Sequence, residues 1–193
     1  MSIAPPPVSL DQPIYALALP LLAEALESAA RLLRKAAAAP AGQAAADLLR
    51  QRLAPDMFCL AHQVVVLTDS LEGAAALLAG ETDEPLASLI FNRGDETALG
   101  EIDQQLEQSL ARLERARARL AALPRGTYRL RPGEVVTVAR PGHVRRFEAL
   151  DFVWRYLLPN AYFHVSMIYA LLRQAGVEVG KADFQGPAPY SIV

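Results

Sequence analysis

The sequence predicts an all-α fold: a four-helix bundle with a small β-hairpin before the last helix. Apolar residues recur at helical spacing over four long segments. The connections between these segments are short, so the four apolar stripes can close on one another. In contrast, β-branched residues gather in one stretch, 134–148, which a turn signal divides into two runs. These three observations together predict helices packed on helices, with a two-stranded insert.

The first predicted helix spans residues 14–38, where the apolar positions recur every three or four residues. Pro20 falls inside this run and should start the regular helix or kink it. The basic residues near its end suit a helix C-terminus, where the helix dipole favours positive charge. After the Pro40 and Gly42 break, a short helical piece is expected over 44–52.

Pro55 and Asp56 are expected to open the second long helix, because both residues suit a first turn. Gly80 should end this helix at the C′ position. A loop is expected over 81–95, in which residues 86–91 could form one more helical turn.

The third helix is predicted from about Glu96 to Leu123. Its acidic residues come early and its arginines late, which complements the helix dipole and indicates a solvated face. A β-hairpin follows over 134–148, with Pro141-Gly142 as its turn. Because a two-stranded ribbon is marginal alone, it should pack on the bundle near the start of the last helix.

The last helix is predicted over 149–175. Pro159 should kink or split it, and Gly176 suits a left-handed C-cap with Val177 as the apolar contact beyond it. The chain of 193 residues suits one domain with a substantial core. We therefore expect a flexible Pro-rich arm over 1–12, a single helical-bundle domain over 13–186 and a tail over 187–193.

Composition excludes several classes of protein. Lys and Arg total 19 against 21 for Asp and Glu, a net charge of -2, so the footprint of a nucleic-acid or anionic-membrane binder is lacking. The single cysteine, Cys59, excludes an intramolecular disulfide and a cysteine-based zinc site. No basic n-region precedes the apolar N-terminal run, so a signal peptide is not expected. We therefore expect a cytoplasmic location. The broad, alanine-rich apolar stripes favour a homodimer formed through a helical face.

Two stretches carry a resemblance to a known family. One is the run Arg52–Phe58, followed by Gln63 and Thr68-Asp69; the other is Leu158–His164, followed by Tyr169–Arg173 and Gly180–Phe184. The chain resembles the bacterial and fungal family named domain of unknown function nineteen ninety-three. That resemblance implies the DinB/YfiT-like superfamily of four-helix bundles, which are often dimeric. Many of its members hold a divalent metal with three histidines, and some are thiol-dependent transferases.

The resemblance implies only a partial metal site. His164 falls on one ligand position of the superfamily, but the residue four positions earlier is Asn160 rather than a histidine. On the second helix the nearest imidazole is His62, about one turn too early. A neutral amide oxygen is a poor ligand for zinc beside imidazole. The expectation is therefore a degenerate site, with a zinc or nickel ion as the alternative.

His164 lies in the middle of the apolar face of the last predicted helix, so it should be buried and point towards the second helix. It could be a neutral core histidine, or a ligand or acid–base group. The polar side chains expected to reach it are Asn160 on its own helix and Gln63, Thr68 or Asp69 on the second. His62 shares a flank with Asp69, which could orient it in a mixed site or be a solvated neighbour on the rim.

Other residues have both a chemical and a structural interpretation. Cys59 could be a reactive thiol at a helix N-terminus or a small buried apolar residue. Lys181 and Asp183 could form a substrate-anchoring pair. The favoured alternative is a clamp that holds the chain end, with Phe184 in a groove and Lys181 near helix C-terminal carbonyls. Trp154 is expected in the core or an interface, and His143 on the surface.

Two functions follow as hypotheses. The favoured one is a dimerising or small-molecule-binding bundle whose metal site is degenerate. The alternative is a metal-dependent transferase or hydrolase of DinB/YfiT type, with an altered ligand set drawn from His62, Asp69, Asn160 and His164.

Overall fold

A computed structural model describes most of the bundle. The described residues are 14–38, 45–79, 86–87, 105–123, 133–140 and 142–187. The predicted N-terminal arm over 1–12 lies outside them, as do residues 188–193 of the predicted tail and the region 96–104 of the third predicted helix.

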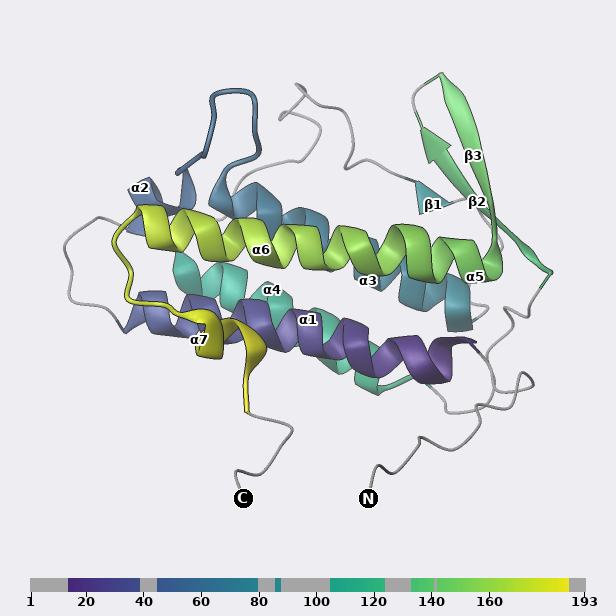
Figure 1. The fold of residues 1–193 in the computed structure, drawn as a ribbon, viewed down its shortest axis with the longest axis horizontal. Helices are drawn as coiled ribbons and strands as arrows, with labels where there is room; N and C mark the ends of the chain where they lie inside the picture. The colour runs from purple at the N-terminus through teal and green to yellow at the C-terminus, as the bar shows by residue number, and fades with distance from the viewer. Residues whose placement is uncertain are drawn as a thin grey trace, which may run out of the picture.

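The long helices of the described residues form the predicted four-helix bundle (Figure 1): α1 (Ile14–Ala37), α3 (Leu60–Ala79), α4 (Leu106–Ala121) and α6 (Leu158–Gln174). The helices α1 and α3 each pack against both α4 and α6, so α1 and α3 lie diagonally across the bundle. The short helix α2 (Ala45–Leu49) matches the piece expected over 44–52. This arrangement makes α3 and α6 direct neighbours, which is what positions the candidate site.

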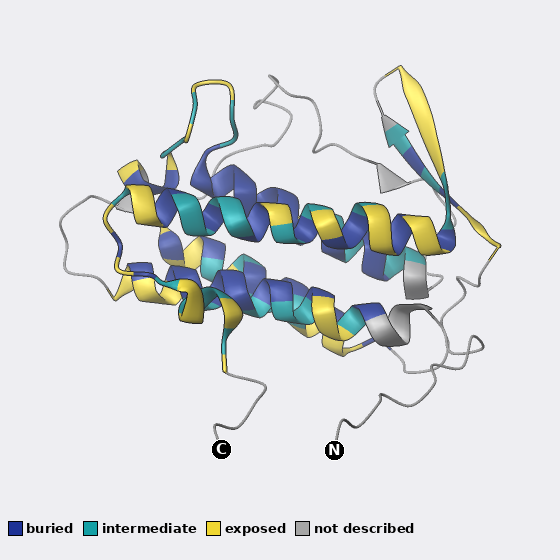
Figure 2. Ribbon diagram, viewed as in Figure 1, coloured by how far each residue is buried: buried dark blue, intermediate teal, exposed yellow. Residues whose placement is uncertain are grey.

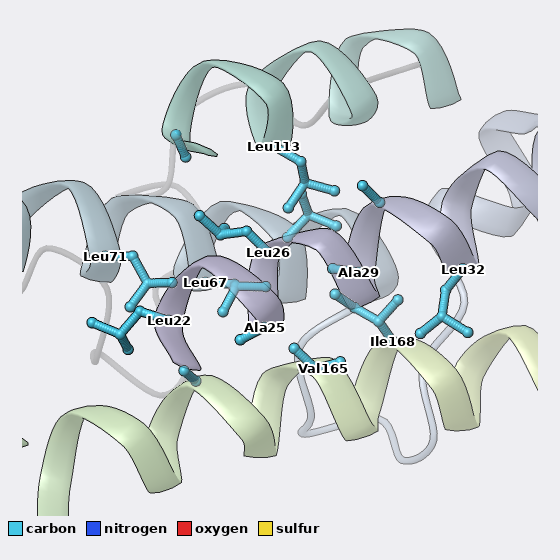
Figure 3. Packing of buried hydrophobic residues seen from close by; sticks show 14 of the residues in the cluster. Leu22, Ala25, Leu26, Ala29, Leu32, Leu67, Leu71, Leu113, Val165 and Ile168 are labelled. Atoms are coloured by element: carbon cyan, nitrogen blue, oxygen red, sulfur yellow. The ribbon is translucent and has the colours of Figure 1, made fainter. Parts of the chain in front are cut away.

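The core is built from the inward stripes of the four helices, and their exposed residues face outward (Figure 2). On α1 the buried residues Leu22, Ala25, Leu26 and Ala29 recur every three or four positions. Figure 3 shows them meeting side chains from the other three helices: Leu67, Leu71, Leu113, Val165 and Ile168. Burial of each large aliphatic side chain contributes about 1.5–3 kcal/mol, so the apolar periodicity accounts for the assembly.

The second long helix begins later than predicted. Pro55 and Asp56 lie in a turn, and α3 starts only at Leu60. Two contacts hold this loop: the Arg52 guanidinium donates to the Met57 carbonyl at 2.6 Å, and the Leu60 N–H donates to the Gln51 carbonyl at 3.0 Å. The prediction was wrong because Pro and Asp suit turns as well as first helical turns. Gly80, where this helix was predicted to end, lies outside the described residues, and α3 is described up to Ala79.

The predicted hairpin is confirmed. Strands β2 (Val135–Arg140) and β3 (His143–Glu148) pair antiparallel, with Val136 opposite Phe147. Val136 and Val138 are buried, and Phe147 stacks against Phe152 and Tyr156 at the start of the last helical run, as expected. A third strand, β1 (Leu86–Ala87), pairs parallel with β2, within the segment 81–95 where a loop with one possible helical turn was predicted. The rest of that segment lies outside the described residues.

The last helical run is continuous from Ala149 to Gln174 but changes type along its length. It comprises α5 (Ala149–Asp151), a π-helical segment η2 (Phe152–Leu157) and α6. The Leu158 N–H donates to the Val153 carbonyl five residues back. Pro159, which follows, has no N–H to donate. The helical run is therefore not split at Pro159, and its irregularity is the π-helical segment immediately before this proline.

The end of this run follows the predicted cap. Gly176 has φ of 83°, in the left-handed region. The Val177 N–H donates to the Leu172 carbonyl at 2.9 Å and the Gly176 N–H to the Arg173 carbonyl at 3.1 Å. These two bonds are the Schellman motif, and Val177 supplies its buried apolar contact.

A short C-terminal helix, α7 (Lys181–Gln185), lies across α1 (Figure 1). The hydroxyl of Ser28 donates to the Phe184 carbonyl at 2.7 Å, and Lys35 pairs with Asp183 at 2.9 Å. The helix itself was not predicted, but the clamp was. Its cation is Lys35, whereas the predicted Lys181 is exposed.

Candidate functional site

The candidate site lies where α3 and α6 pack together. His164 points into the bundle with only 3% of its surface exposed, and Gln63 on α3 is 2% exposed. The Oε1 atom of Gln63 lies 2.7 Å from Nδ1 of His164. The predicted burial of His164 and its predicted contact with Gln63 are confirmed.

Both polar atoms of the Gln63 amide group form hydrogen bonds. Its Nε2 amide nitrogen donates to the Phe58 carbonyl at 3.2 Å. Phe58 precedes α3 in the loop that Arg52 closes, so its carbonyl is presented to the first turn of the helix. The result is a hydrogen-bonded chain from the loop backbone, through Gln63, to the ring of His164.

The environment of His164 keeps its ring neutral. Burial lowers the pKa of His164 from 6.5 to about 4, because a charged imidazolium would lose its hydration. The phenyl ring of Phe163 meets the imidazole edge-on, with ring centroids 5.3 Å apart. Nε2 of His164 is fully buried and has no hydrogen-bond partner among the described residues.

A second buried pair lies one residue before Gln63. His62 is 1% exposed and Cys59 fully buried, and Nδ1 of His62 lies 3.4 Å from the Cys59 sulfur. The prediction that His62 could sit on the rim of the bundle is wrong. Cys59 directly precedes α3 and is buried, which agrees with its interpretation as a small apolar residue.

Among the described hydrogen bonds, none joins His164 to Thr68, Asp69 or Asn160, its other predicted partners. The Thr68 hydroxyl donates to the Val64 and Val65 carbonyls of its own helix. Asp69 is 44% exposed at its side chain and pairs with Arg112 of α4 at 3.8 Å. Partial burial raises the pKa of Asp69, and the Arg112 charge opposes that rise. Asn160 is half-buried, and none of the described hydrogen bonds joins it to His164.

The residues do not fit the metal site that the superfamily implies. In the part of the chain that the structure describes, no three His, Cys, Asp or Glu side chains gather to hold a metal ion. Asp69, one member of the altered ligand set, faces Arg112 on the outside of the bundle.

The remaining predicted residues lie on the surface. Trp154 is 40% exposed, so its placement in the core is wrong and a role in an interface stays a prediction. His143 is exposed in β3, as predicted. Within the described ranges, no helix is both long enough and apolar enough to span a bilayer.

Sequence reasoning missed two features of the site. One is the backbone carbonyl of Phe58, which no sequence pattern marks. The other is the Cys59–His62 contact, which the three-residue spacing at the start of a helix could have indicated.

Comparisons with known proteins agree with this fold. The profile of the family Domain of unknown function (DUF1993) matches residues 14–185. A crystal structure of a DinB family member from Shewanella denitrificans superposes with a TM-score of 0.67 at 24% identity, covering 93% of this chain and 95% of that one. At this identity the likeness shows a common fold. No curated protein matches the sequence.

Proposed function

The chain belongs to the DUF1993 family, and from this premise we propose that it is a small-molecule-binding helical bundle. Its binding group is the neutral imidazole of His164, in the place where DinB-like proteins would carry a metal ligand. His164 and Gln63 form a hydrogen bond of 2.7 Å at this position. We interpret the pair as the remnant of a metal site that has lost its other ligands.

The observation that carries this proposal is Nε2 of His164. This nitrogen is fully buried and lacks a hydrogen-bond partner among the described residues. A buried polar atom left without a partner costs about 1–3 kcal/mol. A bound molecule that supplies the missing partner would recover this free energy, and the pairing would contribute to its affinity.

Acid–base catalysis is less well supported than binding. A general base works best when its pKa lies near the working pH, and burial holds the pKa of His164 at about 4. The ring therefore stays neutral across the physiological range and accepts protons weakly. That property suits a fixed hydrogen-bonding group more than a proton carrier.

The test is native mass spectrometry combined with elemental analysis of untagged protein. The compared proteins are the wild type, His164→Leu and the matched control His143→Asn, which changes an exposed histidine. We expect a small organic molecule bound to the wild type and the control, and absent from His164→Leu. Protein that carries no such molecule in all three samples would overturn the proposal.

A metal result would favour the alternative function. Stoichiometric zinc or nickel that is present in the wild type and lost in His164→Leu would replace this proposal with the metal-dependent transferase or hydrolase. The ligand set would then have to include groups other than the described His, Cys, Asp and Glu side chains, which form no three-membered cluster.

We also propose that the protein acts as a homodimer through a helical face. In its support, two large apolar side chains one turn apart in the last helical run are substantially exposed: Leu150 and Trp154, at 39% and 40%. Sedimentation equilibrium at micromolar concentrations should detect the dimer, and a monomer at tens of micromolar, at least about 10,000-fold above a nanomolar dissociation constant, would contradict it. The cytoplasmic location stays a prediction.

A further inference from the structure

We infer that Gln63 is a positioning residue that places the proton of the His164 ring on Nδ1, so that Nε2 is a hydrogen-bond acceptor and the site takes ligands that carry an O–H or N–H donor. The ligand class in this inference rests on the proposed binding function. The role of Gln63 does not, because it is a property of the protein alone.

The first step is the orientation of the Gln63 amide. A backbone carbonyl can only accept a hydrogen bond, so the atom that faces the Phe58 carbonyl at 3.2 Å must be the amide nitrogen. The amide oxygen then faces Nδ1 of His164 at 2.7 Å. The Phe58 carbonyl thus removes the ambiguity that an isolated glutamine would have.

The second step is the tautomer of His164. An amide oxygen has no proton to give, so the short contact requires Nδ1 to carry the hydrogen and donate it. In a neutral imidazole the other nitrogen then holds a lone pair. That nitrogen is Nε2, the atom that is buried without a partner among the described residues.

The third step is the chemistry of the ligand. A lone pair on a neutral ring accepts a hydrogen bond from a hydroxyl, an amide or an amine. Carboxylate and phosphate oxygens are themselves acceptors, so they would be repelled from this atom. A lone pair can also ligate a metal ion, but the described His, Cys, Asp and Glu side chains offer no three-ligand set.

The experiment is ¹⁵N NMR of the histidine rings in untagged protein near neutral pH. Three histidines are present, and spectra of His164→Leu and His143→Asn assign the signal of His164. We expect a protonated Nδ1 and an unprotonated Nε2 in the wild type. A wild-type ring with its proton on Nε2 would overturn the inference, whether or not a small molecule binds.

Two variants at position 63 test the role of the amide oxygen. In Gln63→Leu the ring loses its acceptor, and we expect Nε2–H to become populated. Gln63→Glu keeps an acceptor at the same reach, so Nδ1–H should be retained. If either variant unfolds, the tautomer measured in the wild type still tests the inference. A folded Gln63→Leu with an unchanged tautomer would contradict the role of Gln63.

A matched control changes a buried side chain on the same helix that carries a hydroxyl in place of the amide of Gln63. Thr68→Val removes a side chain that bonds the backbone of α3, away from His164. We expect the tautomer to be unchanged in this variant, and a change would indicate a general effect of loosening α3.

The donor itself could be part of a ligand or an ordered water molecule. Magnetisation transfer between water and the carbon-bound ring protons next to Nε2 would identify water. A co-purifying organic molecule in the native mass spectrum would identify a ligand. Both results agree with Nε2 as an acceptor, whereas a ligand that places a deprotonated carboxylate or phosphate oxygen against Nε2 would contradict it.

Discussion

The two sides of the bundle use polar groups in opposite ways. Between α3 and α6 lies a neutral, buried pair, Gln63 and His164, with 2% and 3% exposure. Between α1 and α4 lies an ionic network, in which Glu27 contacts both Arg34 and Arg117, and Arg34 also contacts Glu114. The arginine side chains of that network are 43–44% exposed.

The difference arises because the ionic network stays in contact with water, whereas the buried pair does not. Water and salt screen exposed charges, so ion pairs at the surface contribute up to about 1 kcal/mol each. Inside the bundle a charge would be costly, and the pair stays neutral. The buried pair should therefore dominate the response to mutation and pH, and the ionic network the response to salt.

The largest expected effect is that of acid on the α3–α6 pair. The pKa of His164 is about 4 in the folded chain against its ordinary 6.5. As the pH falls from 6.5 to 4, the unfolded chain binds a proton that the folded chain does not, so stability is lost in this window. The loss is about 3 kcal/mol at about 1.4 kcal/mol for each pH unit.

Urea unfolding of the wild type and of His164→Leu at pH 7, 5.5 and 4 measures this effect. Carboxylates such as Glu27 titrate in both proteins, so the difference between the two curves isolates His164. If the free energy of unfolding changed with pH by the same amount in both proteins, His164 would not be the buried, neutral group that the structure describes.

The next effect is the loss of one partner of the pair. Gln63→Leu leaves the Nδ1–H of His164 and the Phe58 carbonyl without their partner. We expect a loss of about 2 kcal/mol in the free energy of unfolding. In a double-mutant cycle, Gln63→Leu with His164→Leu should be less destabilised than the sum of the two single changes. Additive effects would contradict a direct coupling.

A smaller effect is expected for the ionic network. Burial raises the pKa of Glu27, but hydrogen bonds and charges from Arg34 and Arg117 outweigh it, so the pKa is lowered overall. Glu27→Gln should reduce stability by about 0.5–1 kcal/mol at low salt, and by less in 1 M NaCl. Gln63→Leu, measured in the same salts, should show little salt dependence. Equal salt dependence of the two variants would show that the two sides of the bundle do not differ in their electrostatics.

The smallest effect is expected at the C-terminal clamp. Asp183 pairs with Lys35, and a hydrogen bond from Lys35 and another from the Gly180 N–H lower its pKa. Asp183→Asn should change global stability by less than about 1 kcal/mol. It should still speed amide hydrogen exchange in α7, because local opening of this short helix becomes easier. Unchanged exchange in α7 would show that Ser28 and Arg31 hold it without Asp183.

The features that depend on residues within about one helical turn of one another could be predicted from the sequence. The apolar period of α1, the hairpin around Pro141-Gly142 and the cap at Gly176 were all predicted, because each is fixed by side chains close together in the chain. The inward direction of the His164 side chain could also be predicted in this way, because His164 lies on the apolar face of one helix.

The start of α3, the burial of His62 and the choice of Gln63 as the partner of His164 depend on contacts between elements and could not be predicted from local patterns. Four polar residues were candidates, and they lie within a few residues of one another or of His164 in the sequence. Which of them meets the ring depends on how far α3 slides and rotates against α6. That relation is set by the packing of the whole core and by the loop carbonyl of Phe58, neither of which a local pattern encodes.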